Sequence, residues 1–219
     1  MSKIDESMAA LVQIEDRTER ALELAGLIST LFKLRGVVLV VTGELAYASY
    51  ADVPLTQPEL ELAPFTGKLA PRLVQEIMSG QLGGEGAIGR WMIADIPVRL
   101  YNQFDFSMRE LCRDFNTDHG VVKLSPAEEI IADRILASIY PVANPVAHRE
   151  AIQLLINGLT DAFRMDWIAL RKICYLPDYR VGEELAQLRT EAKQRADTLG
   201  LTTDPVDGKA TGKLPDFNI

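Results

Sequence analysis

The 219-residue chain is 47% hydrophobic and 25% charged, a composition typical of globular domains. Its formal net charge of −8 disfavours extensive nucleic-acid binding, because an acidic surface repels phosphate backbones. We expect no membrane association, since the apolar run at 37–41 is far shorter than the roughly 20 residues that a membrane-spanning helix needs. The two cysteines fit a reducing compartment, and the N-terminus lacks the basic and apolar segments of a secretory signal, so we expect a cytoplasmic protein.

The first 124 residues predict alternating helices and strands. Apolar residues recur at helical spacing between 18 and 34, and the β-branched run after Gly36 is typical of a strand buried on both faces. Glu59-Leu60-Glu61-Leu62 alternates polar and apolar side chains, as in a half-buried strand. In chain order we expect a helix at 18–34, a strand at 37–41, a short helix through Tyr50, a strand at 59–62, a helix at 68–79, a glycine-rich loop at 80–89, a strand-rich segment at 90–101 that Pro97 interrupts, and a strand at 120–124.

Helical patterns take over at Ser125. Ser125-Pro126-Ala127-Glu128 matches a capping box, in which Ser125 caps the helix and Glu128 reaches back to it. Further helices are expected at 146–163, 166–175 and 181–199. The fold class is therefore α+β, with a small mixed β-sheet and helices followed by a helical C-terminal part. The predicted division is an α/β domain at 1–124, a C-terminal helical subdomain at 125–200 and a flexible tail at 201–219.

Two acidic residues on the expected strand at 59–62 form the first candidate site. Because strand side chains alternate, Glu59 and Glu61 leave the same face, about 7 Å apart along the chain. Two such carboxylates can share a divalent ion, and Mg²⁺ commonly binds one or two carboxylates together with substrate phosphates. The alternative is that both residues simply form the solvent side of the strand, as acidic residues usually do.

The turn at Gly43 is the second candidate. A buried strand, a glycine and a short helix present free backbone N–H groups at the helix start, where a phosphate can bind. The alternative is that the glycine serves the strand–helix turn for steric reasons alone. Glu44 works against the first interpretation, because its carboxylate would repel a triphosphate.

Taken in order, these segments resemble the motifs of the nucleotidyltransferase superfamily, the DNA polymerase β-like fold, and especially its small bacterial members. In the family pattern, a hydrophobic residue is followed by glycine and then by glycine or serine. A later strand carries two acids that alternate with hydrophobic residues. Similar segments here are Val41-Thr42-Gly43-Glu44 and Glu59-Leu60-Glu61-Leu62. The strand-to-helix segment at 122–137 and the helix start at Asp166-Trp167 are similar to the C-terminal half of those members.

The resemblance implies a nucleotidyltransferase-like domain at 1–124 and an activity. That activity is transfer of a nucleotidyl group from a nucleoside triphosphate to a hydroxyl acceptor, with two Mg²⁺ ions that clamp the phosphates and activate the attacking oxygen. Glu59 and Glu61 would be the catalytic metal ligands, and Asp95 would be the third acid and general base. The residues expected to contact the nucleotide are Gly43, Arg99 and Arg134.

The sequence departs from the family pattern at positions that carry this chemistry. Glu44 stands where glycine or serine is usual, and the paired acids are Glu rather than Asp. The later strand presents Arg99 where a third carboxylate is expected, and Arg134 stands where Lys is common. These departures predict a degenerate site with eroded catalysis and weak residual nucleotide binding. Two alternatives stay open: an active Mg²⁺-dependent nucleotidyltransferase, and a non-catalytic module that binds a protein partner or forms a homodimer.

Overall fold

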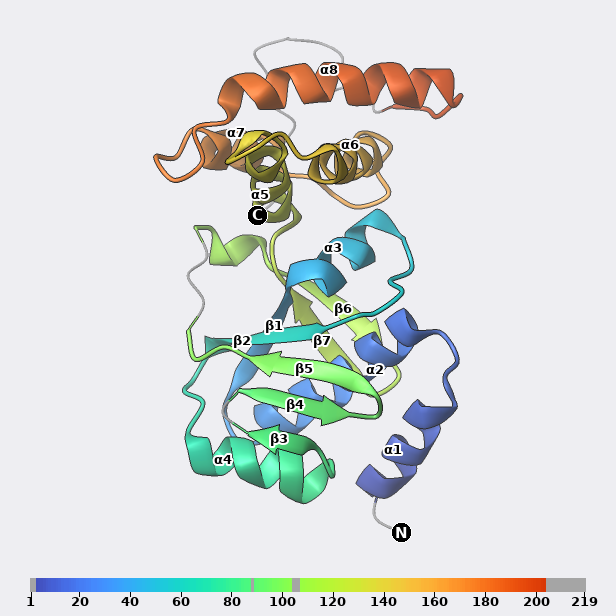
Figure 1. The fold of residues 1–219 in the computed structure, drawn as a ribbon, viewed down its shortest axis with the longest axis vertical. Helices are drawn as coiled ribbons and strands as arrows, with labels where there is room; N and C mark the ends of the chain where they lie inside the picture. Colours follow the sequence, from blue (N-terminus) through green and yellow to red (C-terminus); the bar gives the residue numbers. More distant parts are fainter. Residues whose placement is uncertain (1–2, 88, 104–106, 204–219) are drawn as a thin grey trace. The chain divides into compact units, whose positions relative to one another are not determined.

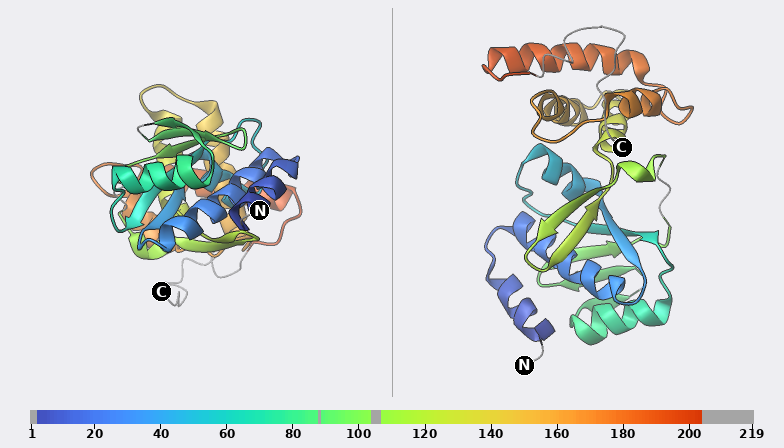
Figure 2. Two further views of the ribbon diagram at one scale, coloured as in Figure 1. Left: turned by 90° about the horizontal axis from the view of Figure 1, so that it is seen from below. Right: turned by 180° about the vertical axis from the view of Figure 1, so that it is seen from behind.

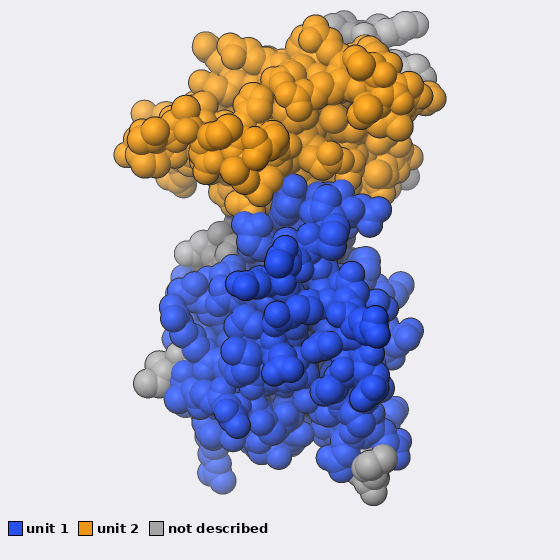
Figure 3. Space-filling model, turned by 45° about the vertical axis from the view of Figure 1, so that its right-hand side comes forward, with its two compact units in different colours: residues 1–125 blue, residues 126–219 orange. Residues whose placement is uncertain are grey.

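The computed structural model of the chain describes residues 3–87, 89–103 and 107–203 (Figure 1 and Figure 2). Most of the predicted tail, 204–219, lies outside the described residues. The chain forms two compact units, residues 1–125 and 126–219 (Figure 3). The first unit contains the β-sheet, and the second is helical in its described part.

Among the described residues, the first unit is centred on a seven-stranded mixed β-sheet (Figure 1). Its strands are β1 (Val38–Thr42), β2 (Leu60–Thr66), β3 (Glu85–Ala87), β4 (Arg90–Ile93), β5 (Ile96–Leu100), β6 (Arg113–Thr117) and β7 (Gly120–Leu124). They lie in the order β3-β4-β5-β2-β1-β7-β6. Strand β1 is parallel to β7 and β2 is parallel to β5, whereas the other neighbouring pairs are antiparallel. This sheet confirms the predicted α+β fold class.

The helices of the first unit are α1 (Lys3–Gln13), α2 (Arg17–Lys33), α3 (Gly43–Ala51) and α4 (Pro71–Gln75), with a π-helical turn at Glu76–Gln81 and a 3-10 turn at Arg109–Leu111. Helix α2 packs across one face of the sheet, against β1 and β7 (Figure 2). The carboxylate of Asp16 caps it by accepting the backbone N–H groups of Thr18 and Glu19. Leu24 and Ile28, which recur at helical spacing, are fully buried. The apolar periodicity of the sequence therefore supplies the core.

Strand alternation directs one face of the sheet to this core and leaves the other face partly open. In β2, Leu60 and Leu62 are fully buried, whereas Glu61 between them is partly exposed. In β5, Val98 is buried and Arg99 is partly exposed. Residues that pair on neighbouring strands share a face of the sheet. Because Glu61 pairs with Arg99, both side chains belong to the open face.

The segment at 80–101 differs from the prediction. Strand β3 forms where the sequence predicts only a glycine-rich loop. The chain then reverses at Ala94 and Asp95, whose φ angles are 49° and 60°, between β4 and β5. Two residues with positive φ suit the tight turn of a β-hairpin. The predicted interruption at Pro97 is therefore wrong, because this residue lies inside β5.

Pro97 fits inside a strand because of the direction in which its nitrogen points. In a two-residue hairpin the residues that flank the turn, here Ile93 and Ile96, form the hydrogen-bonded pair. The next pair, Met92 and Pro97, therefore exchanges no hydrogen bonds across that ladder. The proline nitrogen faces β2 instead, whose pairing with β5 begins one residue further along. The missing N–H thus falls outside the paired part of β2 and β5.

The second unit contains, in its described part, the helices α5 (Ala127–Ile139), α6 (Pro145–Leu159), α7 (Trp167–Cys174) and α8 (Gly182–Thr198). Asn144 and Asp166 cap α6 and α7, and each side chain accepts two backbone N–H groups. Helix α5 packs against α6 and α7, and α6 packs against α8. No helix in the described part of the chain combines the length and the hydrophobicity needed to cross a membrane.

The capping box expected at the start of α5 does not form. Pro126 occupies the capping position with an extended backbone (ψ 129°), so the helix starts one residue later than predicted. The hydroxyl of Ser125 is thereby displaced from the first helical N–H groups, and it has no hydrogen-bond partner among the described residues. Glu128 is fully buried, and its Oε1 accepts the backbone N–H of Asp166 at 2.8 Å. The predicted role of Ser125 is wrong.

Candidate functional site

The turn between β1 and α3 is shaped by a close approach between Gly43 and Glu61. Gly43 has a φ of 68°, a backbone conformation that favours glycine. A Cβ atom at this position would lie 2.2 Å from Oε2 of Glu61. The Glu61 carboxylate therefore occupies the space that a side chain would need, beside the N-terminus of α3. A helix N-terminus carries a partial positive charge, so this placement is electrostatically favourable.

The other oxygen of Glu61 is held by two side chains of the neighbouring β5 segment. The hydroxyl of Tyr101 donates a hydrogen bond to Oε1 at 2.9 Å. Nη1 of Arg99 lies 3.7 Å from the same oxygen, and its guanidinium stands over the Tyr101 ring, 4.9 Å from the centroid. The Glu61 side chain is 19% exposed and that of Arg99 is 36% exposed. Glu61, Tyr101 and Arg99 thus form one cluster at the surface of the open face.

The pKa of Tyr101 reflects this arrangement. Burial raises the pKa above its ordinary value of 10.0, and the hydrogen bond to Glu61 and the charge of that carboxylate raise it further. The charge of Glu59 acts in the same direction, so its carboxylate lies within electrostatic reach of the phenol. Near neutral pH the phenol is therefore protonated and donates to Glu61.

The sheet register sets which residue stands opposite the paired acids. Glu61 in β2 pairs with Thr42 in β1 on one side and with Arg99 in β5 on the other. Arg99 in turn pairs with Arg90 in β4. The four residues form a single row across four strands on one face of the sheet. A guanidinium therefore faces Glu61 at the place where the resemblance leads us to expect a third carboxylate.

Asp95, the predicted third acid, is not brought to Glu61. It lies in the β4–β5 turn, four residues before Arg99, which corresponds to roughly 13 Å along a strand. Its side chain is exposed, and its backbone carbonyl accepts a hydrogen bond from Nη2 of Arg17 at 2.7 Å. In this structure Asp95 is a turn residue that α2 holds through the backbone.

Arg134, one of the predicted nucleotide contacts, lies in α5 of the second unit. Its Nε is 2.9 Å from Oε2 of Glu150 in α6, and both side chains are largely buried, with exposures of 19% and 22%. Within that unit, this ion pair joins two packed helices.

The residues present do not fit a two-metal centre. Such a centre needs several carboxylates that converge on the ions. Among the described residues, no group of three or more His, Cys, Asp or Glu side chains could hold a metal ion. The Glu61 carboxylate is already engaged by Tyr101 and Arg99, and the positive charge of Arg99 would repel a divalent cation at the same place.

Tyr101 of this cluster and Arg90 of the same row across the strands are missed by the sequence analysis. Tyr101 follows Arg99 by two residues, so strand alternation alone places both on one face and could have identified it. The position of Arg90 opposite Arg99 can be predicted only when the hairpin turn is placed at Ala94 and Asp95, because the pairs counted outward from this turn include Arg90 and Arg99. A strand break at Pro97 does not predict that pairing.

No protein-family model and no curated protein matches the sequence. Among solved structures, the fold is similar to the crystal structure of an antigenic nucleotidyltransferase-like protein from Paracoccidioides brasiliensis, with a TM-score of 0.49 and 11% identity, over 80% of this chain and 93% of that chain. It is also similar to the solution structure of the antibiotic-resistance factor ANT(2'')-Ia, with a TM-score of 0.40 and 18% identity, over 79% and 91%.

Proposed function

We propose that this chain is a nucleotidyltransferase-fold protein that has lost nucleotidyl transfer and retains weak binding of a nucleotide through its phosphates. The observation that carries the proposal is the pairing of Arg99 with Glu61 across β2 and β5. Arginine stays protonated throughout the physiological pH range, so this position cannot supply a negative charge to a metal ion. A basic group there suits a ligand that brings negative charge of its own.

The eroded interpretation also explains the state of Glu61. In an active two-metal site this carboxylate would coordinate the ions, with its lone pairs directed at them. Here one oxygen accepts the Tyr101 hydroxyl and the other packs against Gly43. The hydrogen bond and the nearby charge of Arg99 thus compensate the carboxylate in part without a metal.

An active Mg²⁺-dependent nucleotidyltransferase is the second candidate. The observation in its favour is that the charges of Glu59 and Glu61 both act on Tyr101, and that Glu61 lies beside the Gly43 turn. In this alternative Glu59 and Glu61 would be the metal ligands, and Glu61 would have to release Tyr101 before it could bind an ion.

A protein-interaction module is the third candidate, and it draws on the second unit. The connection between α5 and α6 exposes apolar side chains, with Tyr140 at 70% and Val142 at 75% exposure. Ile139 and Val146, at 46% and 49%, flank them. Exposed apolar side chains that gather in one segment are typical of a protein-contact surface, and a homodimer would be its simplest use.

Thermal unfolding with nucleoside triphosphates, each with EDTA, Mg²⁺ or Mn²⁺, tests these candidates. A ligand at one hundred times its Kd adds about 2.7 kcal/mol of stability, or roughly 5–10 °C for a chain of this length. We expect a smaller shift that needs no metal in the wild-type protein. Arg99→Asp, which restores a third acid, should instead respond to Mn²⁺.

Three other outcomes would contradict the proposal. A metal-dependent shift in the wild type that disappears in the double variant Glu59→Ala/Glu61→Ala would favour the active enzyme. Turnover of a nucleoside triphosphate by the wild type would do the same. The absence of a shift with any nucleotide would leave the interaction module as the remaining candidate, with the oligomeric state in solution as its first measurement.

A further inference from the structure

Two arginines stand directly opposite each other on the open face of the sheet. Arg90 in β4 pairs with Arg99 in β5 in antiparallel register, so the two side chains leave the same face with Cβ atoms roughly 4.5–5.5 Å apart. The side chain of Arg90 is exposed, and no hydrogen bond or ion pair joins it to another described residue. A cross-strand pair of like charges at this distance is destabilising.

Within its row, this pair is neutralised only in part. The neighbouring carboxylate in the row is Glu61, whose Oε1 is 3.7 Å from Arg99 and already accepts the shorter hydrogen bond from Tyr101. A direct guanidinium–carboxylate hydrogen bond is about 2.7–2.9 Å long, so the Arg99–Glu61 contact is a loose one. The row therefore carries two guanidiniums and one carboxylate, on a chain whose net charge is −8.

The orientation of Arg99 prepares it to bind an anion. Its guanidinium is positioned over the ring of Tyr101, which limits its rotation and reduces the entropy lost on binding. A planar guanidinium presents N–H groups in a fork that matches two oxygens of a phosphate group. Arg90 and Arg99 leave the same face from paired positions on adjacent strands, so both side chains can reach one phosphate or two that are linked.

The surface beside the pair suits the rest of a nucleotide. Met92 and Pro97 pair with each other, and each lies two residues from one of the arginines, so both belong to the same face. Met92 is 48% exposed. An apolar surface next to a phosphate site can contact a sugar or a base without specific hydrogen bonds.

We infer that Arg90 and Arg99 form a phosphate-binding site that takes the di- or triphosphate of a nucleotide without a divalent metal. This inference rests on the proposed function. It adds that Arg90 takes part in binding, that the phosphates are the part of the nucleotide that is recognised, and that binding needs no Mg²⁺. The arginine pair replaces the charge compensation that metal ions would otherwise give to the phosphates.

The test measures binding of ATP by titration calorimetry in excess EDTA, with inorganic triphosphate as a competitor. We expect the wild-type protein to bind ATP and inorganic triphosphate to compete with it. Arg90→Gln and Arg99→Gln should each weaken ATP binding at least roughly tenfold, because each removes a charge-assisted hydrogen bond. Arg35→Gln is the matched control, because it removes the same charge at an exposed pair with Glu76 away from this row. That variant should bind like the wild type.

The outcomes separate this inference from the function on which it rests. Unchanged ATP binding by both arginine variants would overturn the arginine site but would still support nucleotide binding. A requirement of ATP binding for Mg²⁺ would have the same meaning. No binding of ATP or triphosphate by the wild type would overturn both. The thermal midpoints of the same samples separate loss of folding from loss of binding. Arg90→Gln should keep or raise the midpoint, because it removes one of two like charges at paired positions, whereas Arg99→Gln also removes the contacts with Glu61 and Tyr101.

Discussion

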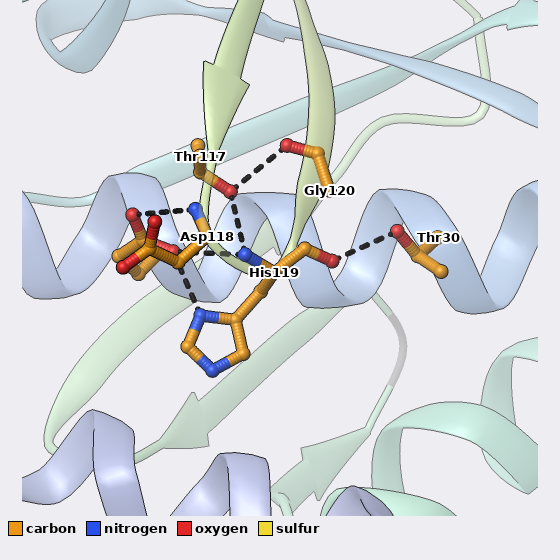
Figure 4. Close-up of polar contacts among 6 residues, drawn as sticks. Thr30, Thr117, Asp118, His119 and Gly120 are labelled. Carbon is orange, nitrogen blue, oxygen red and sulfur yellow. Dashed lines mark hydrogen bonds and ion pairs between the residues drawn. The ribbon is translucent and has the colours of Figure 1, made fainter.

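Two partly buried glutamates of the first unit, Glu23 in α2 and Glu61 in β2, hold their charges in different ways. Glu23 accepts the backbone N–H groups of Asp118 and His119 and contacts Nδ1 of the His119 ring at 2.7 Å (Figure 4). Glu61 has one hydrogen bond from a phenol and one longer contact with a guanidinium, at 3.7 Å.

The difference separates a structural carboxylate from one at a candidate site. Backbone N–H groups are fixed by the fold, so two of the partners of Glu23 stay in place as long as the β6–β7 turn is folded. The partners of Glu61 are side chains, which can rotate toward a ligand at little cost. The comparison teaches that the source of the hydrogen bonds, more than their number, distinguishes the two roles.

The β6–β7 turn packs closely against α2 around the contact between Glu23 and His119. Thr30 on α2 donates a hydrogen bond to the carbonyl of His119 at 3.1 Å (Figure 4). A Cβ atom at Gly26 would lie 2.1 Å from Oγ1 of Thr117, and one at Gly120 would lie equally close to Oγ1 of Thr30. Helix α2 and the β6–β7 turn therefore approach each other closely at Gly26 and Gly120. The contacts of Glu23 lie at the same interface.

The largest expected effect comes from breaking this close approach. Gly120 has a φ of 151°, and its added Cβ would also lie 2.9 Å from the carbonyl oxygen of Gly26. Gly120→Ala should therefore lower the free energy of unfolding by about 3 kcal/mol in a urea titration. Gly36→Ala is the control, because Gly36 also has positive φ but nothing within 4 Å, and we expect a loss of only about 1 kcal/mol. Equal losses would show that backbone strain matters and the packing does not.

Removal of the Glu23 charge comes next in size. Glu23→Gln should cost about 2 kcal/mol at neutral pH, because hydrogen bonds to a charged acceptor are worth more than neutral ones. The free energy of unfolding, measured with urea at pH 7, checks this value. A loss below that of Tyr101→Phe would contradict the division into structural and site carboxylates.

The same variant has a pH signature. Burial by itself would raise the pKa of Glu23, but hydrogen bonds from His119 and from the backbone of Asp118 and His119 outweigh it and hold the pKa below its ordinary value of 4.5. A lowered pKa in the folded state means that this stabilisation is complete above about pH 4.5 and is lost as the pH falls through the folded-state value. The stability difference between wild type and Glu23→Gln should therefore narrow between pH 5 and pH 3. A difference that stays constant over this range would refute the assignment.

At the candidate site the expected loss is smaller. Tyr101→Phe removes the hydroxyl that donates to Glu61 and should lower the free energy of unfolding by about 1 kcal/mol, the usual net contribution of a hydrogen bond. In a Glu61→Gln background the loss should shrink, and the difference between the two backgrounds gives the coupling energy. Strict additivity would mean that the phenol and the carboxylate do not interact in solution.

The smallest effect has the opposite sign. Arg90→Gln relieves the repulsion between the two arginines at paired positions and should stabilise the unliganded protein by about 0.3 kcal/mol at low ionic strength. The gain should vanish in 1 M salt, where the Debye length is roughly 3 Å. Parallel urea titrations at the two salt concentrations measure it, and a destabilised variant would show that Arg90 has a structural role.

Local patterns predicted much of the fold. The periodicity around Leu24 and Ile28 gave α2, and the alternation in Glu59-Leu60-Glu61-Leu62 gave the start of β2. Strand β6 was missed because its residues Arg113 to Thr117 are mostly polar and lie at the edge of the sheet, where strands carry little apolar signal. Helix α1 was also missed, although Ile4, Met8 and Leu11 recur at helical spacing; of these three only Leu11 is buried.

The candidate site was less accessible to prediction, for a different reason. The sequence analysis identified Glu61 and Gly43 and expected Arg99 in the later strand, but their contacts depend on the parallel pairing of β2 with β5, which are not consecutive in the chain. The cross-strand partner of Arg99 also depends on a hairpin turn without glycine or asparagine, formed by Ala94 and Asp95. Long-range register of this kind is set by the whole sheet and leaves no local mark.

The hydrogen bond from Arg17 to the carbonyl of Asp95 has a mechanical consequence. It ties the first turn of α2 to the tip of the β4–β5 hairpin, and Nη1 of Arg20 reaches the adjacent carbonyl of Ala94 at 3.5 Å. The hairpin is thereby anchored at its tip by a helix and along one edge by β2. Unwinding of the first turn of α2 would release that tip. The spacing between β4 and β5, which carry Arg90 and Arg99, would then be less fixed. The start of α2 therefore helps to hold these two strands in place, although it contributes no side chain to the surface that carries the arginines.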